Sequence, residues 1–213
     1  SRGLGDVYKR QDVIVGAPYW EDDTNNEGRA WVYHGSAGGL QTSLAWHAES
    51  NQLGASLGWS VATAGDVNGD GYSDVIVGAP HWGDGGLASE GKVWVYHGSP
   101  SGLSAASAWS RESGQNDAYY GYSVGTAGDV NGDGYADIIL GAPHMTDSVS
   151  DEGTTRVYCG SASGLRTSYD WAGEGGQTLS WYGMSVGTAG DVNGDGYAEV
   201  IVGAKDYNET YIN

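Results

Sequence analysis

The chain has 213 residues, including 38 glycines, 9 tryptophans, 15 tyrosines and one cysteine, and its 27 acidic residues outnumber 9 lysines and arginines to give a net charge of −18. The glycines follow no Gly-x-y period, which excludes a collagen-like chain, and the single Cys159 excludes an intrachain disulfide framework. No apolar run is long enough to span a bilayer, so we expect no membrane insertion. The acidity argues against a nucleic-acid partner, because phosphates require basic residues, and it favours cations.

An internal repeat with a step of 62 or 63 residues organises the sequence. The segment AGDVNGDGYSDVIVGAP begins at Ala64, close copies begin at Ala127 and Ala189, and a truncated copy, DVIVGAP, begins at Asp12. A fixed step of this kind is the signature of repeat architectures. We therefore divide the chain into an atypical, non-native lead-in at 1–11, a partial unit at 12–56, whole units at 57–119 and 120–181, and a partial unit at 182–213.

Each unit contains short β-branched, apolar runs separated by clusters of Gly, Asn, Asp and Ser, a pattern that predicts strands joined by turns. In the unit at 120–181 the expected strands are 122–130, 137–141, 155–160 and a weaker one near 168–172. No segment has the periodicity of a helix. Four antiparallel strands in a repeated unit are typical of a β-propeller blade, and a solenoid is the alternative.

Several motifs recur in the same order in successive units. LGWSV at Leu57 corresponds to YGYSV at Tyr120 and YGMSV at Tyr182, and AGDVNGDGY and then a GAP or GAK segment follow each of them. This order resembles the FG-GAP repeat of integrin α-subunit propellers and their bacterial relatives, with Leu or Tyr in place of the family's Phe. The resemblance implies an all-β propeller with four-stranded antiparallel blades.

The length of the chain bears on how complete such a propeller is. Relatives of this kind form rings of seven blades, which at ~62 residues per blade need roughly 430 residues. This chain has about half that length, so we expect an open, partial β-propeller of about three to four blades. Its ends would expose unpaired strand edges, which intact propellers avoid. The remaining propeller blades or another protomer are therefore expected partners.

The pattern D-x-N-x-D-G-x-x-D occurs three times and predicts three Ca²⁺ sites. Side-chain oxygens at positions one, three, five and nine and a backbone carbonyl at position seven can converge on one cation. Ca²⁺ takes about 6–8 oxygen ligands, and the glycine after the third ligand permits the sharp turn. The predicted ligands are Asp66, Asn68, Asp70, Tyr72 and Asp74; Asp129, Asn131, Asp133, Tyr135 and Asp137; and Asp191, Asn193, Asp195, Tyr197 and Glu199, each tyrosine through its carbonyl.

Two alternatives to this interpretation of the loops need weighing. An EF-hand requires a Glu at position twelve, whereas this chain has Val77, Leu140 and Val202 within strand-like runs. Simple Asn-Gly and Asp-Gly turns are the other alternative. They leave three repelling carboxylates in each loop unexplained. Because the loop oxygens would fill the coordination sphere, we expect the metal to have a structural role rather than a catalytic one.

The resemblance also implies that the face opposite the calcium loops binds ligands. Aromatic rings beside carboxylates suit stacking on sugars or docking of a basic protein surface, and the alternative is that they are ordinary loop residues. On this face the candidate ligand-binding residues are Tyr19, Trp20, His81, Trp82, Tyr119 and Trp181.

No G-x-S-x-G, H-E-x-x-H or P-loop motif occurs, so we expect no enzyme activity. The sequence and the resemblance together predict a secreted, extracellular calcium-binding module for cell adhesion that binds a protein or glycan ligand. The alternative is an accessory propeller of a larger secreted hydrolase.

Overall fold

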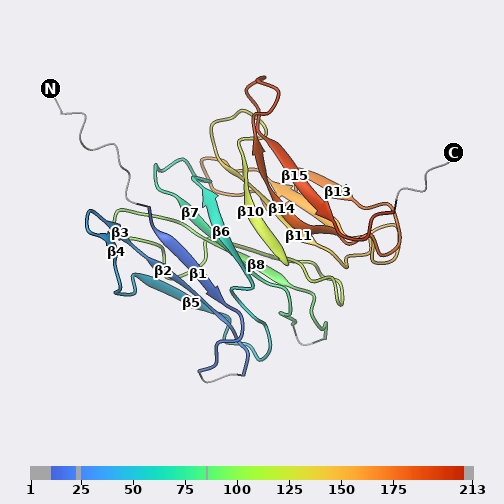
Figure 1. Cartoon of the computed structure of the whole chain (residues 1–213), viewed down its shortest axis with the longest axis horizontal. Helices are drawn as coiled ribbons and strands as arrows, with labels where there is room; N and C mark the ends of the chain where they lie inside the picture. The colour runs from blue at the N-terminus through green and yellow to red at the C-terminus, as the bar shows by residue number, and fades with distance from the viewer. Residues whose placement is uncertain (1–10, 23–24, 85, 209–213) are drawn as a thin grey trace.

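The structure is a computed structural model that describes residues 11–22, 25–84 and 86–208. Within these ranges every regular element is a β-strand, and the sheets follow one another from the N-terminal to the C-terminal side of the molecule (Figure 1). No helix that could cross a membrane occurs in this part of the chain. The lead-in expected at 1–11 lies outside the described residues, except for Gln11.

Two sheets have four antiparallel strands each, paired in the order in which they occur along the chain. This arrangement confirms the predicted all-β fold with four-stranded antiparallel blades. The second sheet of the molecule consists of β6 (Ser60–Gly65), β7 (Asp74–Ala79), β8 (Lys92–Tyr96) and β9 (Trp109–Glu112). The third consists of β10 (Ser123–Gly128), β11 (Asp137–Ala142), β12 (Thr154–Tyr158) and β13 (Trp171–Glu174).

The sheets at the two ends have fewer strands in the described part of the chain. The first has the order β1-β2-β5, and the last pairs β14 with β15. They lie at opposite ends of the molecule, so the series of sheets is open, as expected for a partial propeller (Figure 1). The strands are β1 (Val13–Ala17), β2 (Arg29–Tyr33) and β5 (Trp46–Glu49), with a small hairpin of β3 (Gly35–Ser36) and β4 (Gly39–Leu40), and then β14 (Tyr182–Gly190) and β15 (Glu199–Ala204).

Three predicted strands in the third sheet have wrong limits, and one of them is the strand expected at 155–160, which lies at Thr154–Tyr158. The strand expected at 122–130 ends at Gly128, because the pairing shifts register between Thr126 and Gly128 and the Gly128 amide donates to the Thr126 hydroxyl at 3.1 Å. The last strand lies at Trp171–Glu174 instead of 168–172. The residues before it form a loop, in which the Asp170 carboxylate accepts a hydrogen bond from the Cys159 amide at 2.9 Å.

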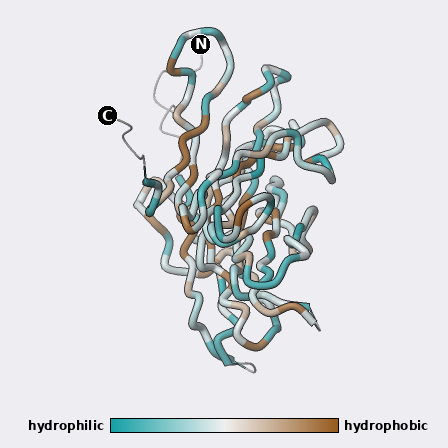
Figure 2. Tube along the Cα trace, turned by 90° about the vertical axis from the view of Figure 1, so that its right-hand side faces the viewer, coloured by the Kyte–Doolittle hydropathy of each residue, from teal (hydrophilic) through white to brown (hydrophobic). Residues whose placement is uncertain are grey.

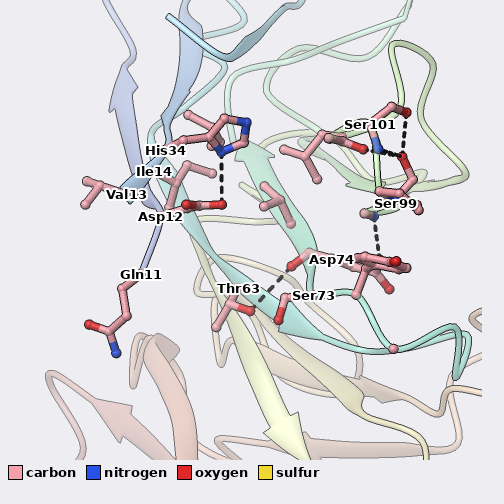
Figure 3. A pocket seen from close by; sticks show the side chains of 18 residues that line it. Gln11, Asp12, Val13, Ile14, His34, Thr63, Ser73, Asp74, Ser99 and Ser101 are labelled. Atoms are coloured by element: carbon pink, nitrogen blue, oxygen red, sulfur yellow. Dashed lines mark hydrogen bonds and ion pairs between the residues drawn. The ribbon is translucent and has the colours of Figure 1, made fainter. Parts of the chain in front are cut away.

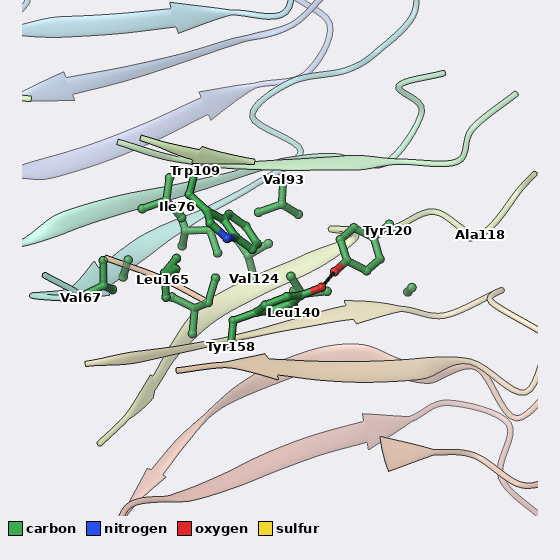
Figure 4. Close-up of a cluster of buried hydrophobic side chains, with 14 of the residues drawn as sticks. Val67, Ile76, Val93, Trp109, Ala118, Tyr120, Val124, Leu140, Tyr158 and Leu165 are labelled. Atoms are coloured by element: carbon green, nitrogen blue, oxygen red, sulfur yellow. Dashed lines mark hydrogen bonds between the residues drawn. The ribbon is translucent and has the colours of Figure 1, made fainter. Parts of the chain in front are cut away.

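The core lies between successive sheets rather than within any one of them. Ile76 of β7 is fully buried and packs in one cluster with Ile138 and Leu140 of the next sheet. Trp109 meets Tyr158 edge to face at 4.9 Å, and the Tyr158 hydroxyl lies 2.6 Å from that of Tyr120 (Figure 4). Apolar stretches of the chain coincide with strands, and hydrophilic stretches coincide with connecting loops (Figure 2). Each sheet therefore buries its apolar face against its neighbour.

Close backbone contact between sheets explains two of the recurring glycines. A Cβ atom on Gly58 would collide with the Arg29 carbonyl of the preceding sheet, and one on Gly121 would collide with the Val93 side chain of the preceding sheet. A Cβ atom on Gly78 would collide with the Gly121 carbonyl oxygen of the next sheet. The glycines that follow Leu57 and Tyr120, and those of the GAP segments, are thus required by this close approach.

A matched pair of isoleucines tests whether burial between sheets stabilises the fold. Ile76 and Ile201 occupy the same position in the repeat, but Ile76 is fully buried and Ile201 is 64% exposed. Truncation of a buried isoleucine leaves a cavity, so Ile76→Ala should lower the free energy of unfolding by about 2–5 kcal/mol. Ile201→Ala should lower it by less than about 0.5 kcal/mol. Urea denaturation measures both, and equal losses would contradict the arrangement of sheets.

Candidate functional site

The three acidic loops connect the first two strands of successive sheets. They lie between β6 and β7, between β10 and β11, and between β14 and β15. The first strands β6, β10 and β14 are neighbours in space, which places the three loops at the same end of the sheets. A loop between two strands agrees with the expected FG-GAP arrangement and differs from an EF-hand, whose loop joins two helices.

The aspartate at position one organises each loop through backbone hydrogen bonds. Oδ1 of Asp66 accepts from the amides of Gly69 and Asp70 at 2.7 and 3.1 Å, and Oδ2 accepts from Gly71 at 2.8 Å. Gly71 has a φ of +87°, which an L side chain rarely adopts. Asp129 and Asp191 accept the same three hydrogen bonds in their own loops. The hydrogen bonds to this one carboxylate therefore define the conformation of the loop backbone.

At position nine, Asp74 is fully buried and joins the loop to the rest of its sheet. Its Oδ2 accepts from the Val67 amide at 2.9 Å, and its Oδ1 accepts from the Gly98 amide at 2.8 Å. Asp137 makes the equivalent two bonds. Burial raises the pKa of both aspartates, and the neighbouring loop aspartates add to the rise while the backbone amides oppose it. A bound cation would favour the charged form of each carboxylate.

The third loop is the one that gathers three carboxylates. Asp191, Asp195 and Glu199 offer oxygens that all lie within 4.8 Å of one another. Oε2 of Glu199 also accepts from the Val192 amide at 2.7 Å. Within the described residues the first two loops do not bring three carboxylates this close. An all-oxygen donor set of this kind fits a hard cation such as Ca²⁺.

The tyrosine at position seven has a second role that the sequence analysis missed. The Tyr135 ring lies beside Gly69 in the loop of the preceding sheet, at a distance that leaves no room for a Cβ atom there. In addition, the Ala136 amide donates to the Asp66 carbonyl at 3.0 Å. Tyr197 and Gly132 repeat the contact one sheet later. Each of the first two loops is therefore held by the sheet that follows it.

At the opposite end of the sheets, six rings form a continuous series that we call the aromatic ladder. It contains four of the predicted ligand-binding residues and adds two that were not predicted, Trp59 and His144. Adjacent ring centroids lie 6.4, 5.3, 5.4, 5.0 and 4.9 Å apart along the series Tyr19, Trp59, His81, Tyr119, His144 and Trp181.

The other two predicted ligand-binding residues form separate stacks. Trp20 meets Trp31 edge to face at 5.1 Å, with the Arg29 guanidinium 4.8 Å from its ring. Trp82 has Lys92 Nζ 4.1 Å from its ring centroid. Each of these rings is already in contact with a cation of its own chain. The structure thus groups Tyr19, His81, Tyr119 and Trp181 and places Trp20 and Trp82 elsewhere.

The ladder combines backbone strain with partial burial. Tyr119 and Trp181 have φ angles of +53° and +51°, which are unusual for bulky residues, and Ser56 has a φ of +58° at the equivalent position of the preceding repeat. Tyr19, at one end, is 65% exposed. Burial lowers the pKa of His81 below 6.5, and its Nδ1 atom is buried with no partner among the described residues. His81 is therefore a neutral ring at pH 7.

A second feature missed in the sequence is a buried glutamate that recurs shortly before β2, β8 and β12, one strand in each of the first three sheets. Glu27, Glu90 and Glu152 are 1%, 2% and 0% exposed. Although burial opposes it, hydrogen bonds from the Ser148 and Val149 amides lower the pKa of Glu152. Recurrence of Glu-Gly at these three positions would have identified them. Glu90 accepts from the Asp84 amide at 3.0 Å, and Glu152 accepts from the amides of its own loop, so these two glutamates hold loops on the ladder side.

Comparison with known proteins identifies relatives of this chain. It is 33% identical over 199 residues to integrin alpha-4 of Xenopus laevis, and the match covers 91% of this chain and 18% of that protein. It is 32% identical over 157 residues to human integrin alpha-6, and the match covers 71% of this chain and 13% of that protein. It is also 31% identical over 173 residues to a phosphatidylinositol-glycan-specific phospholipase D of Dictyostelium discoideum. That match covers 75% of this chain and 18% of that protein. The chain thus spans less than a fifth of the length of these relatives.

The family comparison agrees with the repeat seen in the sequence and with the sheets seen in the structure. The FG-GAP repeat family matches residues 57–96, 120–158 and 182–212, which together make up about half of the chain. Each match begins at or just before the first strand of a sheet and includes one acidic loop. The chain belongs to the FG-GAP repeat family.

Proposed function

We propose that this chain is part of a calcium-stabilised, extracellular adhesion module that binds a protein or glycan ligand and has no catalytic role of its own. The observation that carries the proposal is the group of three carboxylates at Asp191, Asp195 and Glu199 in a loop that recurs three times. The relatives named as integrin alpha subunits support a module of the adhesion type. Cell-surface or secreted localisation is part of the same proposal.

In this proposal calcium contributes folding free energy. The oxygens at positions one, three, five and nine of each loop, with the tyrosine carbonyl at position seven, would hold the ion. Its charge would offset the repulsion among the loop carboxylates, which stand in a chain of net charge −18. Because an ion that binds only the folded state stabilises it, the melting temperature should rise with calcium concentration.

A substitution in the third loop tests the metal assignment. Asp195→Asn keeps an oxygen for the Tyr197 amide, which donates to Asp195 Oδ1 at 3.0 Å, but removes one negative charge from the group. Calorimetric titration of the EDTA-treated chain should show about three calcium sites, and Asp195→Asn should lose one of them. At 100 times the dissociation constant, each site should contribute about 2.7 kcal/mol to stability.

The matched control is Asp206→Asn, which removes the same charge from an exposed residue outside the loop. It should bind calcium as the unchanged chain does. An unchanged melting temperature on addition of calcium, or equal site numbers in both variants, would refute the metal assignment.

The aromatic ladder is the proposed ligand-binding surface. Its exposed end at Tyr19 and its strained members, Tyr119 and Trp181, support this assignment. The faces of such rings suit the C–H groups of a sugar or the cationic side chains of a protein. Both classes belong to the proposal, because the ring faces suit either one.

Two exposed tyrosines provide a test of the ladder. Tyr19 is 65% exposed and belongs to the ladder, whereas Tyr207 is 49% exposed and lies outside it. Titration with an uncharged N-acetylglucosamine trimer and with a lysine- and arginine-rich nonapeptide, followed by tryptophan fluorescence, should detect binding of one of them. Tyr19→Ala should weaken that binding severalfold, since an aromatic contact is worth about 1 kcal/mol. Equal effects of Tyr19→Ala and Tyr207→Ala would count against the ladder.

The lowered pKa of His81 gives the ladder a defined pH dependence. In the unfolded chain the histidine titrates near 6.5, and in the folded chain it titrates lower because of burial. Its contribution to stability is therefore present above pH 6.5 and is lost as the pH falls from there toward the folded-state pKa. The decrease in unfolding free energy between pH 7.5 and pH 5.5 should be smaller in His81→Gln than in the unchanged chain.

The control for this measurement is His47→Gln, because His47 is an exposed histidine outside the ladder. Its pH dependence should match that of the unchanged chain. If His81→Gln loses as much stability on acidification as the unchanged chain, the burial of His81 in the ladder has no energetic consequence.

A second candidate function is that of an accessory propeller in a larger secreted hydrolase. The similarity to a protein named as a phosphatidylinositol-glycan-specific phospholipase D favours it. The full-length open reading frame distinguishes the two candidates, because a neighbouring catalytic domain supports the hydrolase and further FG-GAP repeats alone support the adhesion module.

A further inference from the structure

The acidic loops of neighbouring sheets are joined by hydrogen bonds between main-chain groups. The Ala136 amide donates to the Asp66 carbonyl at 3.0 Å, and the Ala198 amide donates to the Asp129 carbonyl at 2.9 Å. In both pairs the acceptor is the residue at position one of a loop, and the donor directly follows the tyrosine at position seven of the next loop. The three loops are therefore connected in series along the chain.

The donor of each hydrogen bond shares a peptide group with a proposed calcium ligand. One planar peptide group joins Tyr135 to Ala136, and it contains both the position-seven carbonyl of the second loop and the amide that binds Asp66. In the trans form, which this peptide group has, the carbonyl and the amide point in opposite directions. A cation bound to the carbonyl would therefore orient the peptide group and strengthen the donor at its other end.

On the acceptor side, the contacts fall among the ligands of the first loop. Asp66 is the residue around which this loop is folded, and its carboxylate accepts from the Gly69 amide at 2.7 Å. The Tyr135 ring adds a second contact, because a Cβ atom on Gly69 would lie 2.6 Å from its Cε1 atom. Gly69 lies between the predicted ligands Asn68 and Asp70. The second loop thus contacts the first at position one and between positions three and five.

Position nine of the first loop is held by its own sheet instead. The Thr63 hydroxyl donates to the Asp74 carbonyl at 3.4 Å (Figure 3). The Asp74 carboxylate is fully buried and accepts from the Val67 and Gly98 amides at 2.9 and 2.8 Å. The ligands that can respond to the neighbouring sheet are therefore those at positions one, three and five.

We propose that the calcium sites of neighbouring sheets are positively coupled through the peptide groups that follow Tyr135 and Tyr197 and through the rings of these two tyrosines. The proposal rests on the assignment of calcium to the acidic loops. An ion in the second loop fixes Tyr135 and so orders the ligands of the first loop, which lowers the entropic cost of binding there. Coupling is reciprocal, so an ion in the first loop raises the affinity of the second by the same factor. Tyr135 and Tyr197 are positioning residues for the site of the preceding sheet.

Repulsion between the bound ions acts in the opposite direction and would give negative coupling. Salt screens this repulsion with a Debye length of about 8 Å at physiological ionic strength, but it does not screen contact through a peptide group. Positive coupling should therefore be measurable at physiological ionic strength and should persist as the salt concentration rises.

The glycine at position six of each loop reports on that loop alone. The amides of Gly71, Gly134 and Gly196 each donate to the position-one aspartate of their own loop, so their NMR signals should shift when the EDTA-treated chain is titrated with calcium. Asp133→Asn keeps an oxygen for the Tyr135 amide, which donates to Asp133 Oδ1 at 3.0 Å, but should abolish the second site. The first site should then bind calcium about fivefold or more weakly, at the lower end of typical coupling.

A crossed pair of variants tests the contact without removing any ligand. Tyr135→Ala keeps the carbonyl at position seven but removes the ring from Gly69, so the larger loss of affinity should fall on the first site. Tyr197→Ala removes the ring from Gly132, so the larger loss should fall on the second site. Tyr135→Phe retains the ring and should bind calcium as the unchanged chain does. Losses confined to the loop that contains the substitution would overturn the coupling.

The coupling and the proposed function can fail separately. If none of the three glycine signals responds to calcium, both fail. If all three respond but the first site has the same affinity in Asp133→Asn and Tyr135→Ala as in the unchanged chain, the coupling is refuted while the proposed function stands. A first site that binds more tightly in Asp133→Asn would show that ion repulsion dominates and would equally overturn the coupling.

Discussion

Burial between neighbouring sheets is the constraint on which the rest of the structure depends. The apolar residues of a central strand face two different partners: Ile76 packs against the following sheet, while Val77 packs into the cluster shared with the preceding one. A single sheet of this size has no interior of its own, so its stability comes from the sheets on either side. The close contact of Gly78 with Gly121 sets how near the sheets can approach.

This constraint also gives the molecule two ends of different chemistry. The strands hold the acidic loops at one end and the aromatic ladder at the other, because β7 and β11 each begin after an acidic loop and end shortly before a ladder residue, His81 or His144. The acidic loops and the aromatic ladder are therefore separated by the length of one strand. The ladder residues come from different sheets, so their spacing depends on the packing of the sheets and not on any one loop.

The fold was predictable from the sequence because its determinants are local and recur. Glycine-rich acidic loops and β-branched runs identify a strand–loop–strand unit wherever they occur. The orientation of Asp74 was not predictable, since the Gly98 amide that it accepts from belongs to the end of another strand. Trp59 and His144 were missed in the ladder for a similar reason: their ring contacts cross between sheets. The outer strand at Trp171–Glu174 was placed too early because Asp170 is held by the Cys159 amide, a contact that no local pattern encodes.

Each of the first two acidic loops contacts the sheet that follows it in the chain. The first loop is held at Gly69 by Tyr135 and the second at Gly132 by Tyr197, whereas a Cβ atom placed on Gly194 of the third loop would meet no atom of the described chain within 4 Å. Loops with nearly the same donor atoms therefore differ in their surroundings. The support runs in one direction, because each of the first two loops depends on the sheet that follows it in the sequence, and a change at Tyr135 or Tyr197 would disturb the loop of the preceding sheet as well as its own.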